Sequence, residues 1–192
     1  MQEHTPVLSL TWQIAAIEAA DAHHEFIEPE HFFIGLCKLE GFANVTRLRT
    51  LGVPESEVAK VEAEIDLLMG LFERFKIGAT TFRHELRHVK GRGSYSPANP
   101  NDEWVMHRSP QSKRAFERAA ELARQFDAPV VAAPHLLAGL LNNRRHPLVT
   151  WLAGKGINIA GLQEAAEATV LPFLQPAAEP GSQTAPLHTA TD

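Results

Sequence analysis

The chain has 192 residues, enough to bury a core of ordinary size, and a single domain is expected. Its formal net charge of −5 provides no global basic field that would recruit nucleic acid or an anionic membrane. No stretch approaches about 18 consecutive apolar residues, the N-terminus lacks the layout of a signal peptide, and Cys37 is the only cysteine, which excludes an internal disulfide and a thiolate zinc cluster.

The first predicted helix begins at Pro6, a residue suited to a first helical turn, and Thr5 before it is a cap candidate. The apolar residues that recur in this helix at helical spacing are Leu10, Ile14 and Ile17. A second helix is expected from Pro29, with His31 one turn inside it. Gly35 lies further along the second helix, where close helix packing favours the absence of a side chain.

A short third helix is expected to end near Gly52, and a fourth begins after Pro54. The apolar residues of the fourth helix follow alternating steps of three and four, namely Val58, Val61, Ile65, Leu68, Phe72 and Phe75. Such a seam requires a partner helix. The partner is either a helix of the same domain, which is the simpler interpretation, or a second copy of the chain in a homodimer formed through the Val58 to Phe75 seam.

Residues 76–108 differ in character from the segments on either side. Their basic residues up to position 100 are Lys76, Arg83, Arg87, Lys90 and Arg92. Glu85 is the one acidic residue in that stretch, and glycines and prolines follow from Gly91 onward. The pattern predicts a basic connector made of a short helix and then a loop.

The connector also contains His84-Glu85-Leu86-Arg87-His88, which matches the HExxH motif. On a helix, the two histidines could bind zinc while the glutamate activates a water molecule. The extended form of the motif places a third histidine ligand at position 94, where this chain has Ser94. Because Arg83 and Arg87 would also repel a dication, a chance match on a solvated basic helix is the favoured interpretation.

Residues 109–169 repeat residues 5–65 without a gap, and 11 of the 61 pairs are identical where composition alone would give roughly 4. The identical pairs include Pro6 with Pro110, His31 with His135, Gly35 with Gly139, and Gly52 with Gly156. The sequence therefore predicts an all-α fold of two pseudo-symmetric four-helix repeats packed as one domain, residues 4–172. Repeat one is 5–75, the connector is 76–108 and repeat two is 109–172. Residues 173–192 lack apolar periodicity and are predicted to be a disordered tail.

The duplicated series of motifs resembles the N-terminal repeat domain of Clp/Hsp100 unfoldases over residues 4–172. The motifs are Ile27-Glu28-Pro29-Glu30-His31 and Leu51-Gly52-Val53 in the first copy, and Val131 to Leu140 and Lys155-Gly156-Ile157 in the second. The resemblance implies a domain that receives substrate or adaptor proteins ahead of ATPase modules. Those modules are missing from this chain, which has no GxxxxGK[ST] loop, so neither ATP hydrolysis by that route nor a cofactor is expected.

In related domains of some Gram-positive unfoldases, a threonine at the start of the first helix and a glutamate at the start of the second bind phosphorylated arginine, one site per repeat. The matching positions are Thr5 and Glu30 in repeat one, and Ser109 and Pro134 in repeat two. A carboxylate suits a guanidinium, and a hydroxyl with free helix N–H groups suits a phosphate, but Pro134 removes the second carboxylate. A helix cap and an acidic first-turn residue would also be expected at Thr5 and Glu30 for structural reasons.

The paired histidines, His31 and His135, are more typical of hydrogen-bonded structural residues than of catalytic ones. The predicted contact residues for a bound peptide or ligand are Thr5, Glu30, His31 and Ser109, at the starts of the first two helices of the repeats. Helix starts carry unpaired N–H groups and partial positive charge, and therefore accept anionic or extended peptide groups.

The sequence thus predicts a cytoplasmic, non-enzymatic protein-binding module of protein quality control or regulated proteolysis. The expected partners are unfolded or tagged client proteins, adaptor proteins or a Clp-type AAA+ ATPase, and no membrane. One alternative is a zinc metallopeptidase-like protein that uses His84, Glu85 and His88. A second alternative is nucleic-acid binding through the basic connector, which the acidic net charge disfavours.

Overall fold

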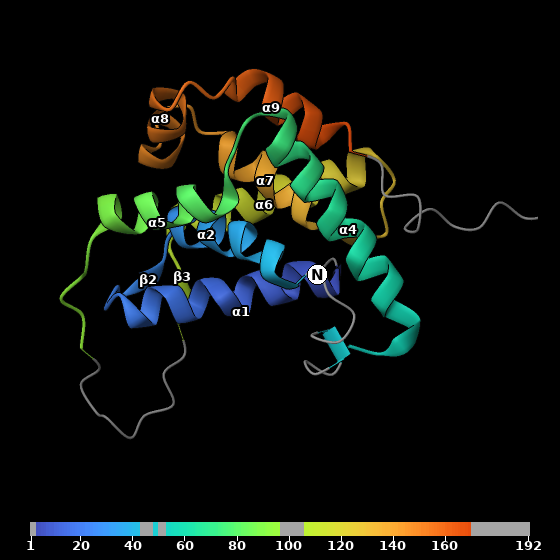
Figure 1. Cartoon of the computed structure of the whole chain (residues 1–192), viewed down its shortest axis with the longest axis horizontal. Helices are drawn as coiled ribbons and strands as arrows, with labels where there is room; N and C mark the ends of the chain where they lie inside the picture. Colours follow the sequence, from blue (N-terminus) through green and yellow to red (C-terminus); the bar gives the residue numbers. More distant parts are fainter. Residues whose placement is uncertain (1–2, 43–47, 50–52, 97–105, 170–192) are drawn as a thin grey trace, which may run out of the picture.

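Figure 1 shows the computed structural model, which describes residues 3–42, 48–49, 53–96 and 106–169. The helices of the first part are α1 (Pro6–Asp21), α2 (Pro29–Lys38), the 3-10 turn η1 (Leu39–Phe42), α4 (Glu55–Arg74) and α5 (Ala79–Lys90). Those of the second part are α6 (Pro110–Gln125), α7 (Ala133–Leu141), α8 (Pro147–Gly154) and α9 (Ile159–Glu167). The predicted all-α fold is confirmed. The helix end at Gly52 and the tail at 173–192 lie outside the described residues.

The first helices of the two repeats begin and end in the same way, as the duplication predicts. The hydroxyls of Thr5 and Ser109 each accept a hydrogen bond from the backbone N–H three residues further on, at 3.2 Å in both cases. After the last turn, His23 (φ 57°) and Asp127 (φ 52°) take the left-handed conformation that closes a helix C-terminus. These equivalences show the pseudo-symmetry at the level of individual hydrogen bonds and dihedral angles.

Two short parallel ladders join the repeats crosswise. Strand β1 (Glu3–His4) pairs with β4 (Val130–Val131), and β2 (Phe26–Ile27) pairs with β3 (His107–Arg108). β1 and β3 precede the first helix of their repeats, whereas β2 and β4 precede the second. Each ladder therefore ties the first helix of one repeat to the second helix of the other. Strands of two residues are too short to show alternation in a sequence, which is why they were not predicted.

An aromatic cluster fills the contact between the repeats. Trp12 of α1 and Phe32 of α2 pack edge-on against Phe116 of α6, with ring centroids 5.1 and 4.9 Å from Phe116. The Arg108 guanidinium lies over Trp12 and Phe116, at 4.3 and 4.6 Å from the ring centroids. Such contacts add cation–π attraction to the burial of the rings, so the interface is a true hydrophobic core.

The apolar seam of α4 faces its own domain. Five of its six residues are no more than 5 % exposed, namely Val58, Val61, Ile65, Leu68 and Phe72. The helix packs against α1 of its own repeat and against α7 and α9 of the other. The simpler of the two interpretations of the seam is therefore confirmed, and a homodimer formed through it is wrong because the seam is already buried within one chain.

The part of the connector up to residue 96 lies across α2 and the end of α1, a placement that the sequence left open. Helix α5 packs along α2, as Figure 1 shows, and its Leu86 is buried. It ends at Gly91 (φ 69°), and the chain then runs beside the turn after α1. There the N–H of Gly93 donates to the Ala22 carbonyl at 2.8 Å, and the N–H of Tyr95 donates to the His23 carbonyl at 2.9 Å.

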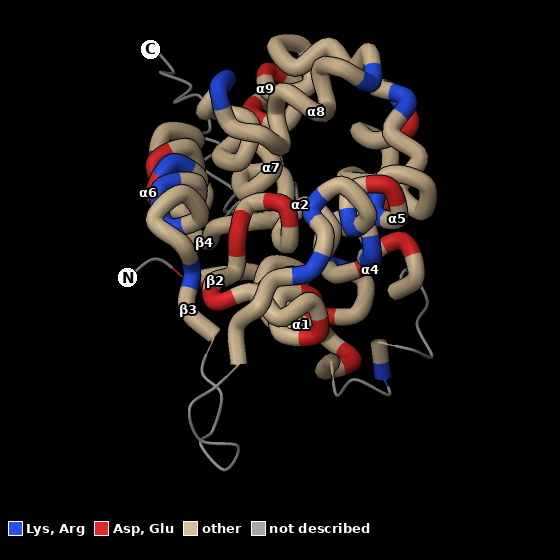
Figure 2. Tube along the Cα trace, turned by 90° about the vertical axis from the view of Figure 1, so that its left-hand side faces the viewer, with Lys and Arg blue, Asp and Glu red and all other residues tan. Residues whose placement is uncertain are grey.

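Charged residues hold the same contact together. Figure 2 shows basic positions of α5 beside acidic positions of α1.

Within the part of the chain that the structure describes, no helix combines the length and the apolar character needed to cross a bilayer.

Candidate functional site

Thr5 and Ser109 lie inside the domain rather than on an open face. Thr5 is only 3 % exposed to solvent, and Ser109 only 1 %. The Thr5 hydroxyl donates to Glu64 Oε1 at 2.9 Å, and the Ser109 hydroxyl lies 3.3 Å from the Ser112 hydroxyl. Both hydroxyls are thus engaged in helix capping and in contacts within the chain.

The backbone at these two caps is bonded to the opposite repeat. The N–H of Thr5 donates to the Val131 carbonyl at 2.9 Å, just before α7, and the N–H of Ser109 donates to the Ile27 carbonyl at 3.1 Å, just before α2. The sequence had grouped Thr5 with Glu30, and Ser109 with Pro134, within each repeat. The structure instead joins each cap to the start of the second helix of the other repeat. A ligand role for Thr5 and Ser109 stays a prediction.

Glu64 of α4 completes this junction, and sequence reasoning missed it. The residue is 1 % exposed, and its Oε1 accepts from the Thr5 hydroxyl and, at 2.7 Å, from the N–H of Ala133 at the start of α7. Burial raises the pKa of Glu64 to about 7, although these two hydrogen bonds act in the opposite direction. A signal was present in the sequence, because Glu64 falls between Val61 and Leu68 on the apolar side of its helix.

Glu30 and His31 begin α2, and both are nearly fully buried. Glu30 contacts Lys90 Nζ at 3.4 Å and His146 Nδ1 at 4.0 Å. The ring nitrogen Nδ1 of His31 accepts a hydrogen bond from the N–H of Glu28 at 2.9 Å. His135 does the same for Ala132 at 3.0 Å, so the predicted structural role of both histidines is confirmed.

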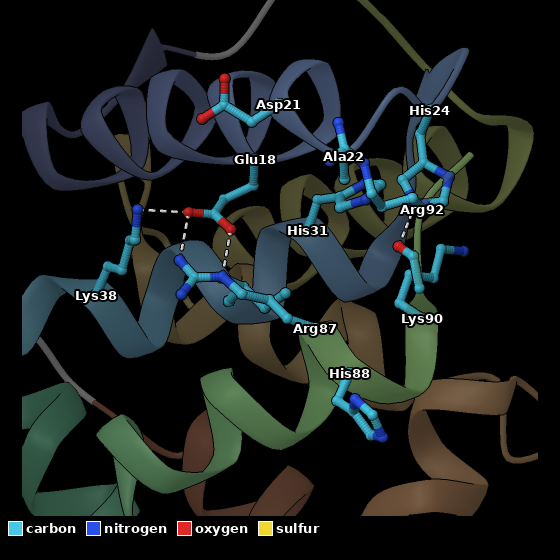
Figure 3. Close-up of a pocket in the computed structure, with 12 residues that line it drawn as sticks. Glu18, Asp21, Ala22, His24, His31, Lys38, Arg87, His88, Lys90 and Arg92 are labelled. Carbon is cyan, nitrogen blue, oxygen red and sulfur yellow. Dashed lines mark hydrogen bonds and ion pairs between the residues drawn. The ribbon is translucent and has the colours of Figure 1, made fainter. Parts of the chain in front are cut away.

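A cavity of about 560 Å³ opens between the end of α1, helix α2 and helix α5, and we call it the α5 cavity. Figure 3 shows the residues around it. They are Glu18, Asp21, Ala22, His24, His31, Ile34, Lys38, Arg87, His88, Lys90, Gly91 and Arg92. Of the four predicted contact residues, His31 alone lines this cavity. Glu30 lies next to it at the start of α2, whereas Thr5 caps the far end of α1 and Ser109 caps α6.

Glu18 is the centre of an ion-pair network on the wall of the α5 cavity. Arg87 of α5 donates from Nε and Nη2 to its two carboxylate oxygens at 2.7 and 2.6 Å, and Lys38 of α2 forms a further ion pair with it. Burial alone would raise the pKa of Glu18, but the hydrogen bonds from Arg87 and Lys38 outweigh it and hold the pKa below its ordinary value. Figure 3 shows this network between α1, α2 and α5.

The sequence carried a signal for this network in a departure from the repeat. Glu18 aligns with Leu122, and Lys38 aligns with Asn142, so the two repeats differ in charge at this corner. The acidic residue of repeat one, Glu18, pairs with Arg87 of the basic connector. Glu18 and Lys38 are thus specific to repeat one, whereas the helix caps are shared by both repeats.

The HExxH residues are not arranged around a common centre. His84 and His88 are exposed on α5, and Glu85 forms an ion pair with Lys155 at 2.5 Å. Among the described residues, no three His, Cys, Asp or Glu side chains converge as a metal site would require. The glutamate that would activate water in a metallopeptidase is instead neutralised by a lysine of repeat two.

We expect protein purified without added metal to contain far less than one equivalent of zinc, and the His84→Ala variant to contain no less than the wild type. Elemental analysis after gel filtration measures the zinc content. The matched control is His107→Ala, which removes an exposed histidine of β3 outside the motif. One equivalent of zinc that is lost in His84→Ala and kept in His107→Ala would contradict this expectation.

No protein-family model matches the chain, and no curated protein matches it either. Among solved structures, the Hsp104 N-terminal domain from Candida albicans superimposes with a TM-score of 0.53 at 16 % identity, covering 86 % of this chain and 89 % of that one. The N-terminal domain of the caseinolytic protease associated chaperone ClpD from Arabidopsis thaliana gives a TM-score of 0.48 at 17 % identity, covering 85 % and 92 %.

The likeness to the Hsp104 domain shows the fold. This protein has the all-helical fold of a Clp/Hsp100 N-terminal domain, as the resemblance of its motifs predicted. At this level of identity the likeness says nothing of clients, adaptors or assembly.

Proposed function

We propose that the protein is a non-enzymatic module that binds other proteins, in protein quality control or regulated proteolysis. Its partners are unfolded or tagged clients, adaptor proteins or a Clp-type AAA+ ATPase. The observation that carries the proposal is the α5 cavity, a recess lined by charged residues in an all-helical domain with the fold of a Clp/Hsp100 N-terminal domain. A cavity of this size accommodates a few residues of a polypeptide.

The geometry of the charged residues favours this function over the two alternatives. A peptidase based on the HExxH motif needs Glu85 free to take a proton from water, and Glu85 is paired with Lys155. Nucleic-acid binding needs a basic surface with unpaired charges. Two of the connector's basic residues, Arg87 and Lys90, are already paired with Glu18 and Glu30 of the same chain.

The contacts of the predicted residues support a location for the proposed docking face. Thr5 and Ser109 are engaged between the repeats and α2 is almost fully buried, so the open part of the predicted surface is the α5 cavity beside α2. His31 lines the cavity there, and Glu30 bonds to Lys90 at its edge. We therefore place polypeptide docking between α2 and α5, with the extended segment after Gly91 along one side.

Site-specific photo-crosslinking tests this proposal. Asp21 is exposed, lines the α5 cavity and ends α1, so an Asp21→Cys variant can carry a thiol-linked photoreactive group. Its matched control is Gln125→Cys, the equivalent exposed position at the end of α6. The native Cys37 is fully buried, and burial raises the pKa of its thiol, so it does not compete for the label.

With a reduced and alkylated, permanently unfolded protein as the client, we expect crosslinks from position 21 and far fewer from position 125. The same protein in its folded form is expected to give none from either position. Equal yields from the two positions, or no crosslink from position 21, would contradict the proposal. The adducts are counted by gel electrophoresis and located by mass spectrometry.

A further inference from the structure

The α5 cavity has a surplus of positive charge on an acidic protein. Its lining contains four cationic residues, Lys38, Arg87, Lys90 and Arg92, against two carboxylates, Glu18 and Asp21, and a third carboxylate, that of Glu30, lies at its edge. The chain as a whole carries a net charge of −5. A local excess of the opposite sign inside a recess concentrates field and attracts anionic groups.

The cationic residues of the cavity differ in whether they are paired with a carboxylate of the same chain. Lys38 and Arg87 are both paired with Glu18, and the charge of Asp21 also acts on Arg87, so two cations and two carboxylates leave that end of the cavity close to neutral. Lys90 has a single ion pair, with Glu30 at 3.4 Å. Arg92 is exposed and forms neither a hydrogen bond nor an ion pair with any residue that the structure describes. The end of the cavity near Lys90 and Arg92 is therefore where an added anion would be attracted.

A buried hydrogen-bond donor without an acceptor marks the same cavity. His31 is 2 % exposed, and its Nδ1 accepts a hydrogen bond from Glu28, so the proton of the neutral ring is on Nε2. Burial lowers the pKa of His31 to about 3, with the nearby charges of His24 and Lys90 adding to the effect, which keeps the ring neutral. Its Nε2 is buried and has no hydrogen-bond partner among the residues that the structure describes. Leaving such a donor unsatisfied is costly.

The equivalent residue in repeat two does not share this feature. His135 makes the same bond through Nδ1, but within the described part of the chain its ring is not among those with a buried nitrogen that lacks a partner. The unsatisfied N–H is therefore a property of the corner covered by α5, and not of the repeated helix start.

We propose that the α5 cavity binds carboxylate groups of an acidic segment in the docked polypeptide. Arg92 and Lys90 supply ion pairs, and the His31 Nε2–H supplies a neutral donor. The ring of His24 lies beside that of His31, with the two centroids 4.9 Å apart, and its Nε2 donates a hydrogen bond to the Gly91 carbonyl at 3.2 Å. A carboxylate reaches the His31 N–H when the His24 ring moves aside. The inference rests on the proposed function and specifies its ligand chemistry.

Fluorescence anisotropy with short labelled peptides tests the inference. We expect a glutamate-rich peptide to bind at least about tenfold more tightly than its glutamine counterpart, and more weakly as ionic strength rises. Arg92→Gln is expected to lower the affinity for the glutamate peptide by about fivefold, because the substitution removes one partly exposed ion pair. Arg124→Gln removes the same charge from an exposed position of α6 and is expected to change nothing.

A nuclear magnetic resonance measurement on labelled histidine reports on His31 without a substitution at this structural residue. Binding of the glutamate peptide is expected to shift the Nε2–H signal of His31 and to leave that of His135 in place. A His31 signal that stays unchanged under saturating peptide would overturn its assigned role as a donor.

Other outcomes separate this inference from the proposed function. If the unfolded client crosslinks to position 21 while the glutamate and glutamine peptides bind equally, the carboxylate inference fails and protein binding stands. If neither client nor peptide binds, both fail. A phosphoserine peptide that binds more tightly than the glutamate peptide would overturn the choice of carboxylate as the ligand class.

Discussion

Replacing Gly139 by alanine is expected to lower the free energy of unfolding by about 2 to 3 kcal/mol. A β-carbon at Gly139 of α7 would lie 2.2 Å from the backbone carbonyl oxygen of Ala115 in α6. Because that oxygen belongs to a helix backbone, it cannot rotate away as a side-chain atom could. The two helices would have to separate, and the core between them would lose its close packing.

The matched control is Gly70→Ala in α4, where a β-carbon would meet nothing within 4 Å. There the greater helix propensity of alanine is expected to raise the free energy of unfolding by about 0.5 to 1 kcal/mol. Chemical denaturation followed by circular dichroism measures both variants. Changes of the same sign in the free energy of unfolding at the two positions would show that stability does not depend on the close approach of α6 and α7.

The Glu64→Gln variant is expected to remove a pH dependence from the stability of the protein. In the folded chain the pKa of Glu64 is about 7, against an ordinary value of 4.5 in the unfolded chain. Between these values the folded state holds a proton that the unfolded state has released, so stability falls as pH rises through this window and levels off above it. The loss amounts to at most about 3 kcal/mol.

Glutamine resembles the protonated acid and does not titrate, so its oxygen can still accept from Thr5 and Ala133 at every pH. We expect Glu64→Gln to match the wild type near pH 5 and to be the more stable protein at pH 8, by urea denaturation at both values. Asp66→Asn removes an exposed carboxylate from the same helix and should leave the pH profile unchanged. A Glu64→Gln profile that still falls between pH 5 and pH 8 would show that another group is responsible.

Several elements could be predicted from the sequence because their causes are local. Thr5 and Ser109 cap helices because a hydroxyl before a proline-started helix accepts from its first free N–H groups. Gly35 and Gly139 were predicted at close helix contacts from their place in a repeated apolar run, and the distances to Thr11 and Ala115 agree. Periodicity likewise predicted the buried face of α4.

The candidate site could be predicted only in part. His31 was predicted as a contact residue from its place at a helix start, and it lines the α5 cavity, but the cavity itself was not predicted. Its main wall is the network of Glu18 with Arg87, residues 69 positions apart in the chain. No local pattern pairs two such residues, because nothing in the spacing of the connector says which helix it will cover.

The sequence alone therefore determined the helices, their caps, the duplication and the class of fold, since hydrogen bonding within a few residues and helical periodicity are local properties. Only the tertiary structure decided that the repeats are joined crosswise, that α5 covers α2, and that Glu64 and the His31 N–H are buried. Those features depend on which surfaces meet when the chain closes on itself. Burial then changes the protonation of Glu64 and leaves the His31 donor without an acceptor.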